Sequence, residues 1–360
     1  MKGKDLGIAI IGSGRIGTLR ALGAEAHPSV RFIACADVDG ANAKKLAERV
    51  GAKVWSTNNF EIMSHPEVDA IIISTGEDEH MEPMMQAFST GKPVLVEKPI
   101  GMDLGDAGEV LDEIKRTGVS VNFGYSRRFH RRYMTAKEQV DQGLLGKIIG
   151  GSARVFNLRA QALEAFKRTP KLTPVVYALT YYIDLMCWIQ EDNPVVEVIA
   201  MGNSGGILTG MGSEADDLTY TILRHKDGAI TNIGISYALP NGYPGRGLNT
   251  RIEFLGTHGV LILDGDHKEQ ILHTEKGMPH VYINDRPVET AFLGSSTPGD
   301  WALGDFWGPV AEETRNWLDH VSTGRKCFLA TPEDARRNLE ISLGIEAAVE
   351  RGTPVTLPLG

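Results

Sequence analysis

Short apolar runs that alternate with helical patterns fill the first third of the sequence and limit what it can fold into. The runs are GIAIIG, RFIACAD, VDAIIIST, PVLVEKP and VSVNFGY, all between residues 7 and 125. Amphipathic segments such as ANAKKLAERV and LGDAGEVLDEIKRTG separate them. Continuously apolar strands that alternate with helices are typical of a parallel sheet covered on both faces. The pattern therefore predicts a doubly wound α/β domain over residues 1–125.

The pattern of the remaining residues differs and predicts a second domain over 126–360. A helix near 135–144 and a strand from 148 precede a long helical segment at 172–189. Strands without helices between them follow, the last of them QILHTEK. Strands linked by short turns are typical of an antiparallel sheet. We therefore expect an α+β domain with one large open, mainly antiparallel sheet, closed by two helices, and a final segment able to pack back on the first domain.

Composition and charge exclude several classes of protein. Of the 360 residues 42% are hydrophobic and 23% charged, as in globular chains. The net charge of −9 argues against nucleic acid as a partner. The three cysteines lack metal-ligand spacing, so neither a disulfide framework nor a metal site is expected. Because no apolar stretch approaches eighteen residues and no signal-peptide pattern is present, we expect a cytoplasmic protein without a membrane partner.

The strand GIAIIG runs directly into GSGRIG, which gives Gly12, Gly14 and Gly17 the spacing of a dinucleotide-binding loop. Glycine is needed there for the tight turn, for the approach of a pyrophosphate to the backbone and for close helix–sheet packing. Asp37 ends the next strand twenty residues later, where a carboxylate binds ribose hydroxyls. The combination predicts a bound dinucleotide, with Arg15 and Ile16 of the loop beside it.

The charges around Asp37 favour NAD over NADP. Val38 and Asp39 follow it, and no arginine comes directly after it to neutralise a 2′-phosphate, which the carboxylate would repel. Arg15 can bind the cofactor phosphates or the adenine. We therefore expect NAD as the cofactor, with NADP less favoured.

Polar residues end two neighbouring strands of the predicted sheet. Ser74 and Thr75 follow one strand, Glu97 and Lys98 follow another, and His80 opens the next helix. Because the carboxyl ends of parallel strands border the ligand crevice, these side chains are expected to face the cofactor. Proline after Lys98 stiffens its backbone, although a solvent-exposed lysine at a strand end is almost as common.

The order of these motifs resembles the glucose-fructose oxidoreductase/inositol dehydrogenase/rhizopine-catabolism (Gfo/Idh/MocA) family of nicotinamide enzymes. The resemblance covers nearly the whole chain. It implies a Rossmann domain, an open sheet domain often used for oligomerisation, and oxidation or reduction of a sugar or cyclitol hydroxyl. It also implies that Lys98 lies beside the nicotinamide and the reacting oxygen. The segments that carry it are GSGRIG, STGEDEH, VLVEKPIG, GYSRRF, TRIEFLGTHGVLIL and TGRKCFLATPEDARRNLEISLGIEAAVERGTPVTL.

The chain departs from the family in the helix that begins the second domain. Many members carry an Asp there and, four residues later, a His that exchanges the proton. When the following Ile183-Asp184-Leu185 is aligned, Tyr177 and Tyr181 stand at those positions. Similarity to members with a tyrosine at the histidine position implies that Tyr181 exchanges the proton. A free tyrosine has a pKa near about 10, so this role needs a nearby positive charge, which Lys98 can supply.

Helical periodicity places the two tyrosines on one face. At about 100° per residue, Tyr177, Tyr181, Asp184 and Trp188 fall on one side of the helix. Aromatic rings that stack on a sugar would use such a face, but so would a helix buried on both sides. The opposite side is an apolar stripe, expected to be core: Leu172, Val175, Val176, Leu179, Ile183 and Met186.

Other residues are weaker candidates for binding the substrate. Tyr177, Arg128, Asn157 and His80 can hold its hydroxyls or a carboxylate. The basic run from Arg127 to Arg132 fits a solvated helix start at least as well as a binding patch. The glycine-rich loop NGYPGRG, residues 241–247, fits either a rim of the substrate site or an oligomer contact.

These observations predict an NAD-dependent dehydrogenase or ketoreductase that acts on a secondary hydroxyl of an inositol-like ring, sugar or glycoside. One alternative is an enzyme that oxidises and then re-reduces its substrate around an elimination or hydrolysis, with no net redox change. A second alternative is a non-catalytic NAD-binding regulatory protein. A small polyhydroxylated substrate is the expected partner, and a homodimer or homotetramer through the second-domain sheet the expected assembly.

Overall fold

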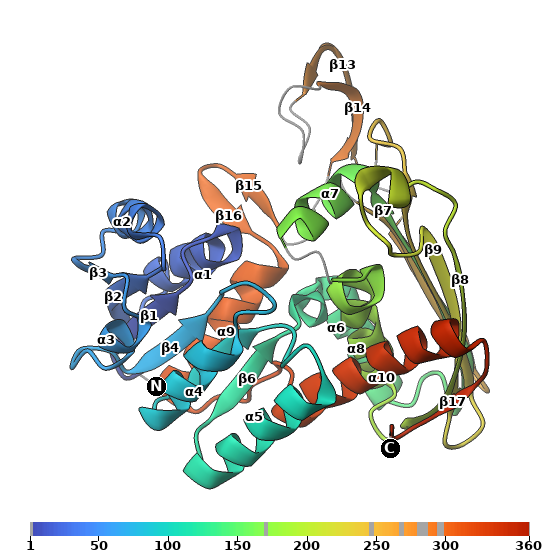
Figure 1. The fold of residues 1–360 in the computed structure, drawn as a ribbon, viewed down its shortest axis with the longest axis horizontal. Coiled ribbons are helices and arrows are strands. Elements are labelled where there is room, and N and C mark those ends of the chain that lie inside the picture. The colour runs from blue at the N-terminus through green and yellow to red at the C-terminus, as the bar shows by residue number, and fades with distance from the viewer. Residues whose placement is uncertain are drawn as a thin grey trace. The chain divides into compact units, whose positions relative to one another are not determined.

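A six-stranded parallel sheet forms the centre of the first part of the chain (Figure 1). The computed structural model describes residues 3–168, 172–244, 248–265, 270–278, 287–293 and 299–359. They divide into two compact units, one of Met1–Phe129 with Pro298–Leu339, the other of His130–Thr297 with Glu340–Gly360. The boundary falls within the last helix, α10 (Pro332–Arg351).

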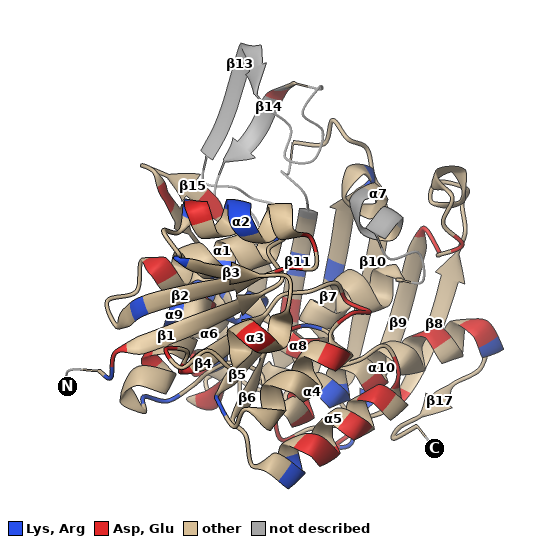
Figure 2. Cartoon of the chain, turned by 60° about the vertical axis from the view of Figure 1, so that its left-hand side comes forward, with Lys and Arg blue, Asp and Glu red and all other residues tan. Residues whose placement is uncertain are grey.

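The strands of the first unit have the order β3-β2-β1-β4-β5-β6 and are all parallel, so the predicted doubly wound domain is confirmed. Strands β1, β4 and β5 are buried along their whole length, which explains their unbroken apolar runs. Figure 2 shows the Lys, Arg, Asp and Glu residues mainly on the surrounding helices. The strands are β1 (Leu6–Ile11), β2 (Val30–Ala36), β3 (Val54–Ser56), β4 (Ala70–Ile73), β5 (Val94–Glu97) and β6 (Val121–Gly124).

Helices cover both faces of this sheet. Helix α1 packs against α9, a helix from near the end of the chain, while α4 packs against α3 and α5. The helices and short elements of the unit are α1 (Arg15–Glu25), α2 (Gly40–Arg49), α3 (Asn59–Met63), α4 (Met81–Ser89), α5 (Leu104–Thr117), the 3-10 turn η1 (Ser126–Phe129), the hairpin of β15 (Asp300–Ala302) with β16 (Asp305–Trp307), and α9 (Pro309–Thr323).

Helix α9 belongs to the core of the first unit, although the sequence analysis assigned its residues to the second domain. Its side chains Trp317 and Leu318 are buried with the apolar residues of β1 and α1. Hydrophobic periodicity shows that a helix has a buried face but not which distant element covers it. The core of the Rossmann unit is therefore completed by residues more than 300 positions away from the strand that opens it.

A buried ion network ties α9 to α1 and β5. Arg20 of α1 is fully buried. Its Nε and Nη2 donate to Glu97 Oε1 at 2.8 and 2.6 Å, its Nη2 to Glu313 Oε2 at 2.5 Å, and its Nη1 to Thr314 Oγ1 at 2.9 Å. Burial is the main reason that the pKa of Glu313 rises to about 7, against the opposing effect of Arg20. One guanidinium thus serves two carboxylates on different elements.

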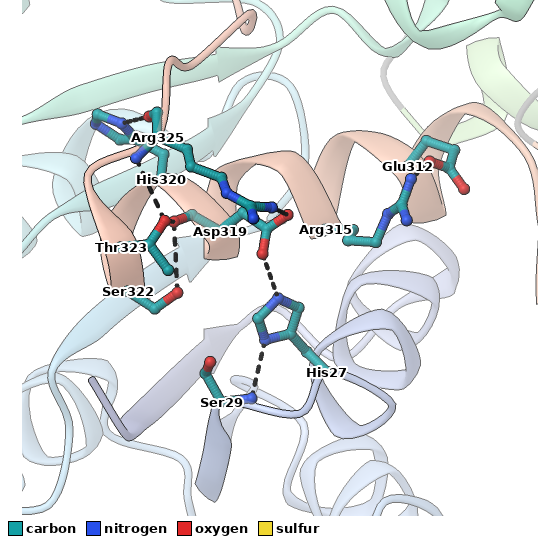
Figure 3. Close-up of polar contacts among 9 residues, drawn as sticks. All are labelled: His27, Ser29, Glu312, Arg315, Asp319, His320, Ser322, Thr323 and Arg325. Carbon is teal, nitrogen blue, oxygen red and sulfur yellow. Dashed lines mark hydrogen bonds and ion pairs between the residues drawn. The ribbon is translucent and has the colours of Figure 1, made fainter. Parts of the chain in front are cut away.

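A second polar cluster fixes the far end of α9 (Figure 3). The N–H of Ser29 donates to His27 Nδ1 at 3.2 Å, so the ring proton is on Nε2, which lies 3.4 Å from Asp319 Oδ1 of α9. Burial is the main cause of the lowered pKa of His27. Arg325 Nη1 lies 3.6 Å from the other oxygen of Asp319. The carboxylate therefore joins α9 to the turn before β2.

The second unit is built on a seven-stranded sheet of order β12-β11-β7-β10-β9-β8-β17. Among the described strands of this sheet only β7 and β10 pair in parallel, so the prediction of a large, mainly antiparallel sheet is confirmed. The segment QILHTEK was wrongly placed in it, because β13 pairs with β14 in a separate hairpin. The strands are β7 (Ile148–Leu158), β8 (Val195–Asn203), β9 (Leu218–His225), β10 (Ile230–Leu239), β11 (Leu248–Gly256), β12 (Val260–Asp264), β13 (Gln270–Met278), β14 (Val288–Leu293) and β17 (Val355–Thr356).

The helices of the second unit pack on one face of that sheet, α7 against β7 and β10, and α6 against α8. The expected helix at 172–189 is instead a π-helical turn that continues into an α-helix, and α7 was not expected. None of the described helices is long and apolar enough to cross a membrane. The helical elements are α6 (Arg131–Asp141), α7 (Arg159–Arg168), the π-turn η2 (Val175–Leu179), α8 (Thr180–Ile189) and the 3-10 turn η3 (Thr209–Met211).

The other face of the sheet exposes a band of apolar side chains. Along β9 burial alternates residue by residue, as expected for a strand with one covered face. Exposed residues align across the strands: Met201 is opposite Tyr220, and Ile199 is opposite Ile222. The band consists of Ile149, Ile199, Met201, Tyr220, Ile222, Ile230, Leu255, Val260 and Ile262.

We predict that replacing Arg20 destabilises the protein strongly. Arg20→Leu leaves Glu97 and Glu313 buried without their counter-ion, and removing one partner of a buried ion pair costs about 3–5 kcal/mol. Urea denaturation measures the change in the free energy of unfolding. Arg315→Leu is the control, because Arg315 of α9 is largely exposed and its ion pair within the described part of the chain is with Glu312, one turn earlier. A loss for Arg20→Leu as small as that of the control would contradict the prediction.

Candidate functional site

The turn between β1 and α1 needs glycine at two positions for reasons of space and conformation. Gly12 has φ of +90°, and a Cβ there would lie 2.6 Å from the carbonyl oxygen of Ser74. A Cβ on Gly17 would lie 1.9 Å from the carbonyl oxygen of Gly12. The loop therefore closes tightly over the end of β4.

Gly14 differs from these two glycines, because a Cβ added to it would meet nothing within 4 Å. It is exposed and precedes the first turn of α1, where backbone N–H groups have no partner within the helix. Open space above the N-terminus of a helix suits the approach of a phosphate to the backbone. The first helical residues are Arg15, whose side chain is exposed, and Ile16, which is half-buried.

Asp37 is fixed beside this loop at the end of β2. Its Oδ2 accepts the N–H of Ser13 at 2.7 Å and its Oδ1 the N–H of Asp39 at 2.9 Å. The carboxylate is half-buried, so lone pairs remain for ribose hydroxyls. Val38 beside it is 83% exposed and leaves that side of the carboxylate open.

Ser74 lies across the loop from Gly12, at the end of β4. Its Oγ is buried and has no hydrogen-bond partner among the described residues. A buried hydroxyl without a partner is costly and is commonly satisfied by a ligand or water. Together with the open space at Gly14 and the oriented Asp37, this donor fits a dinucleotide that runs along the carboxyl ends of β1, β2 and β4.

A chain of hydrogen bonds holds the backbone of Lys98. His80 Nε2 lies 3.3 Å from the carbonyl oxygen of Lys98, and its Nδ1 lies 2.8 Å from Thr75 Oγ1. A carbonyl oxygen only accepts, so Nε2 carries the proton and Nδ1 accepts from the hydroxyl. Burial is the main reason that the pKa of His80 is lowered, which keeps the ring neutral. Both nitrogens are thus engaged within the first unit, although the sequence analysis made His80 a substrate ligand.

The amine of Lys98 is buried and faces a carboxylate that the sequence analysis did not single out. Lys98 is 6% exposed, and its Nζ lies 3.6 Å from Oε1 of Glu77, which is 8% exposed. The structure therefore does not support the alternative of a solvent-exposed lysine. A signal for Glu77 was present in the sequence, because it lies in the segment between β4 and α4 that also supplies Thr75 and His80.

Glu97 was expected to contact the cofactor, but its carboxylate is directed to Arg20. The Nε and Nη2 of Arg20 both donate to Oε1 of Glu97. Its role in the described structure is to anchor the end of β5, one residue before Lys98. No local pattern indicates this pair, because the two residues are 77 positions apart.

The basic run is mostly buried, which does not support its interpretation as a solvated helix start. Arg127, Arg128 and His130 are each less than 9% exposed. Arg128 Nη2 donates to Asp334 Oδ2 of α10 at 3.0 Å, within the first unit. Arg128 and Arg337 both lower the pKa of Asp334 against its burial. The run therefore helps to hold the start of α10.

The helix predicted to carry the aromatic face is present in the second unit, but it is not regular. The stripe expected to be core is buried throughout. Tyr177, Tyr181 and Trp188 are half-buried, and Asp184 is fully buried. Tyr177 lies in the π-turn, in which the N–H of Thr180 reaches the carbonyl oxygen five residues back. Such turns occur often at functional sites.

Two further candidates lie in the second unit. Asn157 of β7 is 1% exposed, and its Oδ1 has no hydrogen-bond partner among the described residues. In the loop 241–247, Asn241 Oδ1 accepts the N–H of Ala160 at 3.1 Å, and Tyr243 accepts from Asn249. Residues 245–247 of this loop lie outside the described residues.

Comparison with known proteins identifies both parts of the chain. Residues 6–125 match the family model described as "Oxidoreductase family, NAD-binding Rossmann fold", and residues 133–262 match the model of the GFO/IDH/MocA C-terminal domain. The chain belongs to the Gfo/Idh/MocA family. It is an NAD-binding oxidoreductase, as the sequence analysis predicted.

Relatives resemble the chain over most of its length. A scyllo-inositol 2-dehydrogenase (NAD(+)) of Bacillus subtilis is 25% identical over 359 residues, covering 97% of this chain and 95% of the relative. A 2,7-anhydro-N-acetylneuraminate hydratase of Mediterraneibacter gnavus is 24% identical over a match that covers 75% of this chain and 73% of the relative. The crystal structure of a scyllo-inositol dehydrogenase from Lactobacillus casei with bound NAD(H) and scyllo-inositol superposes with a TM-score of 0.78 at 20% identity, covering 98% and 99%, which shows the shared fold.

We predict that alanine has different effects at two glycines of the loop. Gly14→Ala should leave the melting temperature unchanged but weaken NAD binding about tenfold or more, because its methyl group fills only space open to the cofactor. Gly17→Ala should lower both the melting temperature and the affinity for NAD, because its methyl group displaces the backbone at Gly12. Calorimetry and NAD titration measure the two effects. Full NAD affinity in Gly14→Ala would contradict the placement of the phosphates.

Proposed function

We propose that the protein transfers a hydride between NAD and a secondary hydroxyl or ketone of a cyclitol or sugar ring, with an inositol-like polyol as the substrate class. The observation that carries the proposal is the buried amine of Lys98 at the end of β5, in the sheet edge that also bears the glycine loop. The dehydrogenase relative named for scyllo-inositol supports the substrate class.

The cofactor would be held by the residues around the first three strand ends. The pyrophosphate would lie over Gly14, the ribose would bind Asp37, and the hydroxyl of Ser74 would gain its missing partner there. Thr75 would act through His80. When bound, the nicotinamide supplies the acceptor or donor of the hydride.

Lys98 would stabilise the charge that develops on the reacting oxygen. A rigidly held ammonium in a site without water is worth more than the same charge in solvent. The described contacts hold it from three directions: Glu97 is fixed by Arg20, the carbonyl oxygen of Lys98 by His80, and the ammonium by Glu77. These contacts would fix the position of the ammonium group before the substrate binds.

Tyr181 would take the proton from the hydroxyl in oxidation and return it in reduction. Its phenol would need the charge of Lys98 to act near neutral pH. The support for this role is its place on the half-buried aromatic face and the resemblance to members with a tyrosine there. Tyr177 and Asn157 would bind the other substrate hydroxyls. The amide oxygen of Asn157, which has no partner among the described residues, suits a hydroxyl donor.

A second candidate function keeps the cofactor bound and produces no net redox change. The relative named as a hydratase supports it. The absorbance of NADH at 340 nm separates the two functions: net NADH formation with a polyol supports the dehydrogenase, whereas product without NADH supports the recycling enzyme.

We predict that Tyr181→Phe lowers kcat about 100-fold or more, because it removes one hydroxyl and leaves the ring to pack. NAD affinity should stay within about twofold. Tyr182→Phe is the matched control, since Tyr182 follows on the same helix but is 2% exposed. The double variant with Lys98→Met should lose little more than either single variant, because groups that act on one oxygen are not additive. Wild-type turnover in Tyr181→Phe would refute its role.

We also propose that the apolar band on the open face of the seven-stranded sheet is the contact between subunits of a dimer or tetramer. Exposed apolar areas of this kind mark association surfaces. Nine large apolar residues lie on it, and they come from the strands β7, β8, β9, β10, β11 and β12.

We predict that Ile222→Asp reduces the assembly to a smaller species. Ile222 is 42% exposed, so the new carboxylate leaves the fold intact but is desolvated in a subunit contact. Light scattering after size exclusion measures the mass. Phe60→Asp, at a residue 47% exposed on α3 of the first unit, is the control and should leave the mass unchanged. An unchanged mass of Ile222→Asp would place the contact elsewhere.

A further inference from the structure

Three acidic residues in a row, Glu77, Asp78 and Glu79, form the turn between β4 and α4. The N–H of Glu79 donates to the carbonyl oxygen of Gly76 at 3.0 Å, which places Glu77 and Asp78 at the two central positions of the turn. Asp78 and Glu79 are exposed, as acidic side chains in turns usually are. Glu77 alone of the three is buried. The turn therefore directs one carboxylate inward although solvent is open to its neighbours.

The inward carboxylate faces the amine of Lys98 across 3.6 Å. Removing a carboxylate and an ammonium from water costs several kcal/mol for each ion and is recovered only through their mutual attraction and further polar contacts. An ion pair of this kind is poor evidence of a gain in stability. Its use lies in fixing where a charge stands and in keeping that charge present.

We infer that Glu77 is a positioning residue for Lys98, the counter-ion that holds its amine in the ammonium form and aims it at the reacting oxygen. The inference rests on the proposed function for the role of Lys98. It extends that function, because it adds a group that acts only through the lysine. A cationic nicotinamide disfavours a second positive charge close by, and the carboxylate offsets that repulsion.

Two other titratable groups of the first unit near Lys98, Glu97 and His80, have contacts that do not involve its amine. Glu97 accepts from Arg20, so its charge is already matched. His80 is buried, its pKa is lowered mainly for that reason, and it donates to the carbonyl oxygen of Lys98 as a neutral ring. Glu77 forms an ion pair with the amine of Lys98 at 3.6 Å. By the proposed function Tyr181 would also lie near it.

The first test measures the charge state of Lys98 directly, without turnover. Competitive acetylation of the protein without cofactor, followed by mass spectrometry of the Lys98 peptide, gives the pH at which the amine becomes reactive. Glu77→Gln keeps the size of the side chain and removes its charge, so this pH should fall by about one unit or more. Glu79→Gln is the matched control and should leave it unchanged, and the exposed Lys44 is the internal standard. An unchanged Lys98 profile in Glu77→Gln overturns the inference.

The second test measures turnover with NAD and the best polyol from a panel of inositols and hexoses. Glu77→Gln should lower kcat about tenfold or more, shift the alkaline limb of the kcat–pH profile downward, and leave the Kd for NAD within about twofold. Glu77→Asp keeps the charge and should restore part of kcat. A purely structural role would change KM, NAD binding or thermal stability and leave the pH limb in place, which would overturn the inference.

The two tests separate this inference from the function on which it rests. If Lys98→Met retains full kcat, the proposed function fails, while a shifted acetylation profile in Glu77→Gln still establishes the ion pair. If Lys98→Met is inactive and Glu77→Gln keeps the wild-type kcat and pH limb, the proposed function stands and the role of Glu77 is refuted.

Discussion

The guanidinium of Arg20 joins three parts of the first unit that the rest of the site depends on. Arg20 lies on the helix that begins at the glycine loop. Its guanidinium donates to the carboxylate of Glu97, one residue before Lys98, and to Glu313 on a helix from near the end of the chain. Buried charges of this kind tolerate few arrangements, since each lone pair left without a donor is costly. The loop that would hold phosphates and the strand end that presents the amine are therefore fixed relative to each other by one side chain.

The same network explains why α9 belongs to the Rossmann unit. Apolar packing of Trp317 and Leu318 is compatible with many orientations of α9. The ion network, which includes two carboxylates and the hydroxyl of Thr314, is compatible with one orientation. The contact of His27 with Asp319 fixes the other end of the helix. The first unit is thus closed by polar contacts at both ends of a helix whose middle is apolar.

Much of this was predictable from the sequence, and the failures have physical causes. Unbroken apolar runs revealed the parallel sheet because its strands are buried on both faces, and the glycine spacing revealed the loop because only glycine fits there. Glu97 was expected at the cofactor, but its partner Arg20 is 77 positions away, and no local pattern encodes such a pair. Glu77 was not predicted, because three consecutive acidic residues are typical of a solvent-exposed turn. Only the backbone conformation determines which of the three side chains is buried. The pairing of QILHTEK with β14, outside the seven-stranded sheet, is another contact that no local pattern encodes.

The π-turn at Val175–Leu179 also affects how positions along this helix are counted. A π-turn contains one residue more than a turn of α-helix, so positions before it are displaced by one relative to a helix that is regular throughout. Tyr181 lies beyond the turn and keeps its register with the Ile183-Asp184-Leu185 segment. Tyr177 lies within it, and counting back from Tyr181 through the extra residue reaches Val176. A helical wheel drawn for a regular α-helix therefore puts Tyr177 one position away from its place in the structure.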